Sequence, residues 1–211
     1  MKRRTLDIAF SIGGAMFAVL LLVLGLVLKN QADFASNYVK DQLSLQKITF
    51  TPEAGLNGEQ ADAPCLITYA GTVLDSGKKA ECYANQYIAY HLSEAAKAAG
   101  YEGDTYATLG APQRELRTQL AAAQDAGTDT TAIQASLDAV NGLRDTMFKG
   151  ETLRGLLLTT YGFSIFGDRA DLAALVCLIG AALLLLLSIA GFAHALMSHK
   201  GDKVVVPVTN S

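Results

Sequence analysis

Residues 8–28 read "IAFSIGGAMFAVLLLVLGLVL", a run of twenty-one residues without a charged side chain. As a helix rising 1.5 Å per residue, this run reaches roughly 30 Å, the thickness of the hydrocarbon core of a bilayer. A second apolar run, "LAALVCLIGAALLLLLSIAGFAHALM", fills residues 172–197. The sequence therefore predicts two membrane-spanning helices, one near each end of the chain.

Glycines occur within both runs, and small residues let membrane helices approach one another closely. We therefore expect helix–helix contact at the following glycines: Gly13, Gly14, Gly25, Gly180 and Gly191. Neither run carries an ionisable side chain in its middle, which argues against a proton or ion pathway through this chain.

Charge near the two runs predicts the orientation of the chain. Three basic residues precede the first run and two lysines follow the second, and short basic flanks stay on the cytoplasmic side. Both ends, residues 1–7 and 198–211, are thus expected in the cytoplasm, with the protein in the cell membrane. The loop of residues 29–171, with 12 Lys and Arg against 18 Asp and Glu, is expected outside.

The alternative for residues 8–28 is a cleaved signal peptide. Its apolar stretch is longer than the usual h-region, and "LVLKNQADFA" offers a poor cleavage site. We expect an uncleaved anchor. The tail, residues 198–211, contains "KVVVPV" and is expected to be a disordered end.

The loop is long enough for one domain, and its richness in Ala and Leu favours helix. Residues 31–48, which follow the first apolar run, contain no Gly or Pro, so we expect the first helix to continue past its span to about residue 47. Apolar residues at three- and four-residue steps predict further helices over residues 78–99, 112–127 and 129–147. A chain that leaves the membrane and returns needs an even number of passes. The predicted fold class is therefore an all-α membrane protein, with a four-helix-bundle-like extracytoplasmic domain over residues 29–147.

Residues 48–76 hold prolines and glycines and are too irregular to place. Cys65 lies in this stretch and Cys82 in the helix that follows it. An even pair of cysteines on the oxidising side of a membrane predicts a disulfide. Cys177, within the second span, is expected to be a packing residue.

The segment before the second span, residues 148–171, includes the apolar stretch "FKGETLRGLLLTTYGFSIFG". Three interpretations stay open: an amphipathic helix in the membrane interface, a docking surface for another membrane subunit, or the end of the fourth helix packed on the first. Its candidate partner-binding residues are Leu153, Leu157, Tyr161, Phe163 and Phe166.

The sequence offers no constellation for catalysis. The three histidines, His91, His194 and His199, are divided by the predicted membrane, so they cannot form one metal site. No nucleophile elbow, phosphate-binding loop or zinc-protease motif occurs. We expect no enzyme activity, no cofactor and no metal, and the acidic loop indicates no nucleic-acid partner.

The segments "PCLITYAG", "YANQYIAYHL" and "FKGETLRGLLLTTYGFSIFG", followed directly by a leucine-rich span, resemble an uncharacterised family of two-span membrane proteins from actinobacteria. The resemblance covers nearly the whole chain and implies the same architecture, with no established catalytic or binding residues. Some members bear an automatic label of aromatic ring-opening dioxygenase, which the scattered histidines do not support.

Two functions follow as hypotheses. The first is a non-catalytic accessory or structural protein in the bilayer, whose loop domain and residues 148–171 bind a membrane or envelope protein, or a second copy of the chain. The second is an extracytoplasmic ligand sensor that passes its signal to a separate protein. The first is favoured, because a sensor must bias a two-state output and this chain carries no output domain.

Overall fold

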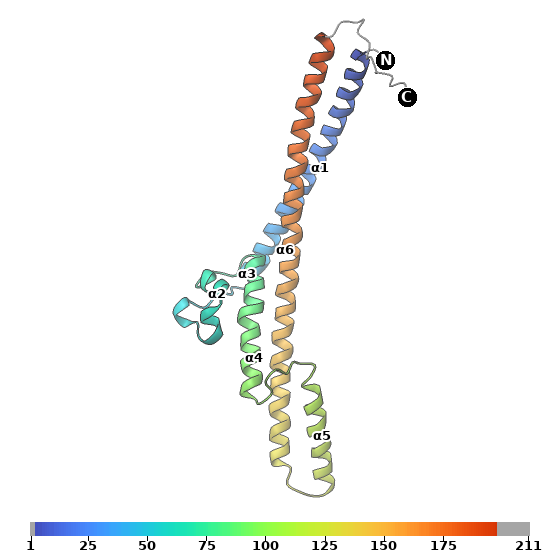
Figure 1. Cartoon of the computed structure of the whole chain (residues 1–211). Coiled ribbons are helices and arrows are strands. Elements are labelled where there is room, and N and C mark those ends of the chain that lie inside the picture. Colours follow the sequence, from blue (N-terminus) through green and yellow to red (C-terminus); the bar gives the residue numbers. More distant parts are fainter. Residues whose placement is uncertain (1–2, 198–211) are drawn as a thin grey trace, which may run out of the picture. The chain divides into compact units, whose positions relative to one another are not determined.

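The computed structural model describes residues 3–197 (Figure 1). The cytoplasmic tail predicted for residues 198–211, and His199 with it, lie outside the described residues. Regular structure within the described part is helical, apart from one antiparallel bridge between Thr49 and Val73. The elements are α1 (Arg3–Leu45), the 3₁₀ turns η1 (Glu53–Gly55) and η2 (Gly58–Asp62), α2 (Pro64–Tyr69), α3 (Gly77–Cys82), the π-helix η3 (Tyr83–Ile88), α4 (Ala89–Ala98), α5 (Gly110–Asp125) and α6 (Thr131–Met197).

Helices α1 and α6 are both long and apolar enough to cross a membrane. The prediction that the first helix continues past its span is confirmed, because α1 has no break before its end at Leu45. Helix α6 is 67 residues long and runs without a break through residues 148–171, which joins segments that the sequence had separated. Asp129 caps α6, accepting a hydrogen bond of 2.9 Å from the backbone N–H of Thr131.

The chain divides into two compact units. The helix-pair unit consists, in its described part, of residues 3–36 and 166–197. The loop unit consists of residues 37–165. Each unit is described by itself below.

In the helix-pair unit, α1 and α6 meet along small residues. A Cβ atom added to Gly14 would lie 2.6 Å from the hydroxyl of Ser188, and one added to Gly191 would meet the hydroxyl of Ser11. The contact is lined by buried alanines on both helices: Ala18, Ala32, Ala35, Ala174, Ala181 and Ala195. Helix–helix contact is thus confirmed for Gly14, Gly25, Gly180 and Gly191, whereas Gly13 faces open space.

Ion pairs join the two helices near both ends of this contact. Lys29 contacts Asp171 at 2.8 Å and Asp33 at 2.9 Å, and hydrogen bonds to these carboxylates raise the pKa of the Lys29 ammonium above its ordinary value. His194 lies 3.0 Å from Asp7. All of these side chains except the half-buried Asp7 are solvent-exposed, so water and salt screen the pairs and small residues provide most of the packing.

The core of the loop unit forms where α1, α3, α4 and α6 converge. One row of its residues recurs every four positions: Ala80, Ala84, Ile88, Leu92 and Ala96. A spacing of four drifts around an α-helix of 3.6 residues per turn, but the wider turn of the π-helix η3 keeps this row on one face. Val39 and Leu43 of α1 and Met147 and Leu157 of α6 complete this side of the core.

The stretch between α1 and α3, which could not be placed from sequence, folds back on itself. Phe50 donates its N–H to the carbonyl of Thr72 at 2.9 Å, and Leu74 donates to Ile48 at 2.9 Å. The two extended ends thus pair, with η1, η2 and α2 between them. Phe50 and Leu74 are fully buried, so the stretch contributes to the core.

The four predicted helices of the loop are present, but the structure does not show them arranged as a four-helix bundle. Within the described part, α5 buries only Gly110 and adds no residue to the core. It lies along the first part of α6, whereas α4 lies along the middle of α6 (Figure 1). Gln113 donates to Asn141 at 2.6 Å, and Arg144 donates to Gln113. The α5–α6 contact is therefore a helical hairpin beside the core.

Candidate functional site

The predicted disulfide is confirmed in its geometry. The Cα atoms of Cys65 and Cys82 lie 6.0 Å apart, and their sulfur atoms are bonded. Ser76 caps α3, accepting a hydrogen bond from the N–H of Lys79. The disulfide thus ties α2 to the last residue of α3 and holds the irregular stretch against the core.

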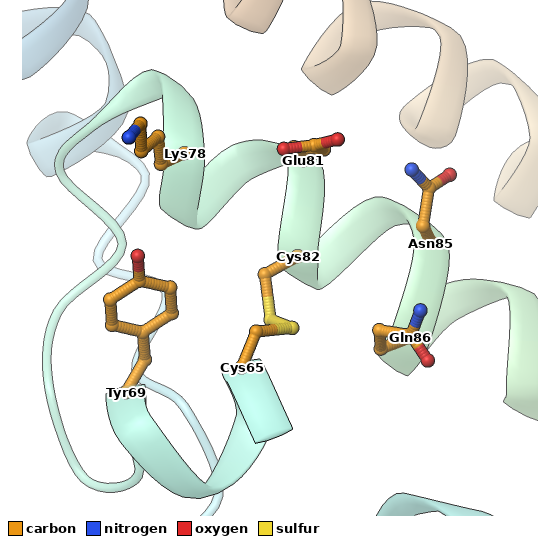
Figure 2. A pocket seen from close by; sticks show the side chains of 7 residues that line it. All are labelled: Cys65, Tyr69, Lys78, Glu81, Cys82, Asn85 and Gln86. Atoms are coloured by element: carbon orange, nitrogen blue, oxygen red, sulfur yellow. A yellow bond between two sulfur atoms is a disulfide. The ribbon is translucent and has the colours of Figure 1, made fainter. Parts of the chain in front are cut away.

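A pocket of about 290 Å³ opens beside this disulfide (Figure 2). Its wall is polar on the α3 and η3 side, with Lys78, Glu81, Asn85 and Gln86, and aromatic on the α2 side, with Tyr69. An ammonium, a carboxylate and two carboxamides can bind a small polar molecule through hydrogen bonds. The described residues hold no group of three or more His, Cys, Asp or Glu side chains that could bind a metal ion.

His91 lies in a cluster of aromatic rings, which accords with a structural role. Its ring contacts Tyr87 with centroids 4.5 Å apart and Tyr90 at 5.6 Å, and its Nε2 lies 3.3 Å from the amide of buried Gln60. Tyr87 in turn stacks on Tyr83 at 4.5 Å. Burial, with a smaller effect from Tyr87, raises the pKa of the Tyr83 phenol to about 12.

The candidate partner-binding residues of α6 divide between two faces. Leu157 is 4% exposed and lies in the core, so its side chain is not on the surface and the prediction is wrong for this residue. Tyr161 is half-buried, and Leu153 lies at the border between the faces, 39% exposed. Phe163 is 41% exposed, and Phe166, which belongs to the helix-pair unit, is 77% exposed.

An uncharged face of α6 with exposed apolar side chains points away from the core. Its large side chains are Phe148, 54% exposed, Leu156, 62% exposed, and Phe163, spaced by eight and seven residues and so by about two helical turns. Between them lie small or uncharged residues at helical spacing. We call this set the α6 face: Phe148, Thr152, Gly155, Leu156, Thr159, Gly162 and Phe163.

Neighbouring elements extend the α6 face at both ends. Tyr106 contacts Phe148 with ring centroids 5.5 Å apart, and Tyr38 of α1 contacts the edge of Phe163 at 6.2 Å. Neither Phe148 nor Leu156 is among the residues predicted from the sequence to bind a partner. The signal for them was the uncharged row of residues at three- and four-residue steps, which continues through Thr152 and Thr159.

Comparison of the chain with protein-family models, with curated proteins and with solved structures finds no match.

Proposed function

We propose that this protein is a non-catalytic, membrane-anchored accessory or structural protein that binds a protein partner through the α6 face. The single observation that carries the proposal is this face, which exposes three large apolar side chains in a row on one helix. Contiguous apolar patches of this kind are rare on surfaces that only contact water, and they mark interaction sites.

Two features support a membrane-anchored protein with an extracytoplasmic loop unit. Its two cysteines are at bonding distance, and disulfides persist in oxidising compartments rather than in the cytosol. Both apolar helices also expose large hydrophobic side chains along their predicted spans, such as Met16 and Leu187. Lipid is the solvent that such a surface requires.

Site-specific photo-cross-linking in native membranes tests the proposal. A photoreactive amino acid in place of Leu156 is expected to give discrete protein adducts. The same group in place of Gln119, which is exposed on α5, is expected to give none. The variant Leu156→Glu should abolish adducts formed from position 163 while the protein still folds and reaches the membrane. A face that yields no adduct from either position would contradict the proposal.

The pocket beside the disulfide favours a second candidate, the ligand sensor. Lys78 and Glu81 present opposite charges on its wall, an arrangement suited to a small zwitterion such as a free amino acid. A panel of free amino acids should then raise the melting temperature of the full-length protein in detergent. The effect should be lost in a Lys78→Ala, Glu81→Gln double variant. If no amino acid in the panel changes the melting temperature, the ligand-sensor function is rejected.

A further inference from the structure

Two glycines of the α6 face are not used for packing within the chain. No heavy atom lies within 4 Å of the position that a Cβ would take at Gly155 or at Gly162. Glycine inside a helix costs about 1 kcal/mol relative to alanine, and glycines on a helix surface allow another helix to approach closely. Two other glycines of the loop unit do so inside the chain: Gly77 packs on Ser164, and Gly150 packs on Leu92.

The two open glycines lie seven residues apart on the same face as Leu156 and Phe163. Between them, Thr159 donates its hydroxyl to the carbonyl of Gly155 at 2.8 Å. The polar group of Thr159 is thus satisfied within its own helix, and the side chain needs no polar partner. Small residues flanked by large apolar ones form a surface on which another helix packs closely.

The absence of charged residues on the α6 face restricts which helix can pack on it. The α6 face carries no charged residue, and the nearest charges on α6 pair with each other: Lys149 with Asp145 at 2.5 Å, and Arg154 with Glu151 at 2.9 Å. A partner therefore needs an uncharged helical face of similar length. The α6 face of another molecule meets this requirement.

The symmetry of a dimer is also compatible with a second copy of the chain as the partner of the α6 face. Two copies anchored in one membrane with the same orientation are related by a two-fold axis along the membrane normal, so their α6 helices run parallel. Residues near such an axis meet their own copies. Glycine, threonine and leucine tolerate this contact, whereas charged residues would repel each other.

We propose that the α6 face is the dimer interface of this protein, with Gly155 and Gly162 allowing two α6 helices to pack closely. This inference rests on the proposed function, in which the α6 face binds a protein, and it names a second copy of the chain as that protein.

Cysteine cross-linking of the full-length protein in membranes tests the contact. In a Cys177→Ser background, Thr159→Cys should give a disulfide-linked dimer on mild oxidation. Gln119→Cys on α5 should stay monomeric. The reduced fraction can be labelled to show that both cysteines are accessible.

A matched pair of glycine variants tests the close approach. Gly155→Leu with Gly162→Leu should raise the dimer dissociation constant at least about tenfold, measured by energy transfer on dilution in lipid vesicles. Gly142→Leu is the control, because Gly142 is equally open but lies off the α6 face, and it should leave the dissociation constant unchanged. Circular dichroism of each variant shows that the helices are retained.

The outcomes separate this inference from the proposed function. A monomer in vesicles whose position 156 cross-links to a different protein would overturn the dimer and leave the proposed function intact. The absence of every adduct would overturn both. A dimer that the double glycine variant does not weaken would place its contact elsewhere and overturn the proposed interface.

Discussion

Leu156 and Leu157 are adjacent in α6 and lie in opposite environments, with Leu156 62% exposed and Leu157 4% exposed within the core of the loop unit. A change at one position should therefore affect binding and a change at the other should affect folding. Leu157→Ala is expected to lower the free energy of unfolding by about 2–5 kcal/mol, because it leaves a cavity in the core. Leu156→Ala should change it by no more than about 0.5 kcal/mol. Chemical denaturation of the protein in detergent distinguishes the two.

The disulfide should contribute measurably to stability. Cys65 and Cys82 are 17 positions apart, and closing a loop of this size restricts the unfolded chain by about 3 kcal/mol in the chain-entropy model. A Cys65→Ser, Cys82→Ser variant should lose about that much unfolding free energy. Cys177→Ser, which removes the free cysteine within the second span, is the control and should change little. Equal stability of all three proteins would contradict the expected role.

High pH should destabilise the loop unit through Tyr83. Its pKa in the folded protein is about 12, against an ordinary value of 10.0, so folding favours the neutral phenol. The associated stability is fully present below pH 10, and it is lost as the pH rises towards 12. Tyrosinate absorbance in the ultraviolet should show one group titrating late, and Tyr83→Phe should remove it. A titration that is unchanged in Tyr83→Phe would assign the late group to another tyrosine.

Gly77 should not tolerate a side chain. A Cβ at this position would overlap the side chain of Ser164 on α6, so Gly77→Ala is expected to destabilise the protein by about 1–3 kcal/mol. Gly142→Ala, at an open helical position, should stabilise it by up to about 1 kcal/mol.

The overlap at position 77 in Gly77→Ala can also be relieved by removing the side chain of Ser164. Ser164→Gly should restore part of the stability lost in Gly77→Ala, and a double-mutant cycle measures that coupling. Additive effects of the two changes would show that the helices can separate at this point without cost.

Helix positions followed well from the sequence because they depend on local signals. The steps of apolar residues and the lack of Gly or Pro over residues 31–48 are both properties of neighbouring residues. The disulfide could also be predicted from the sequence, since its formation depends on the compartment and on the number of cysteines there. These signals do not encode how the helices assemble.

The arrangement of α5 and the choice of face on α6 depend on contacts between distant residues. Leu116 and Leu120 have helical spacing, yet they stay half-buried, because α5 lies beside the core and adds no residue to it. On α6, leucines occur on both faces between residues 153 and 158, so apolar periodicity could not show which face meets the core. The π-helix η3 decides part of this. Its Ala84 carbonyl accepts a hydrogen bond from Arg154 at 3.1 Å and so helps orient α6.

The two serine–glycine contacts of the helix-pair unit also fix the axial register of α1 against α6. Ser188 lies where a side chain on Gly14 would stand, and Ser11 lies where one on Gly191 would stand, so the two contacts are reciprocal. A slide of about one turn would place Ser188 opposite Ser11 or Ala18, whose side chains fill the space that Gly14 leaves open. In lipid, where apolar surface alone gives no preference between positions, these four residues specify a single alignment of the spans.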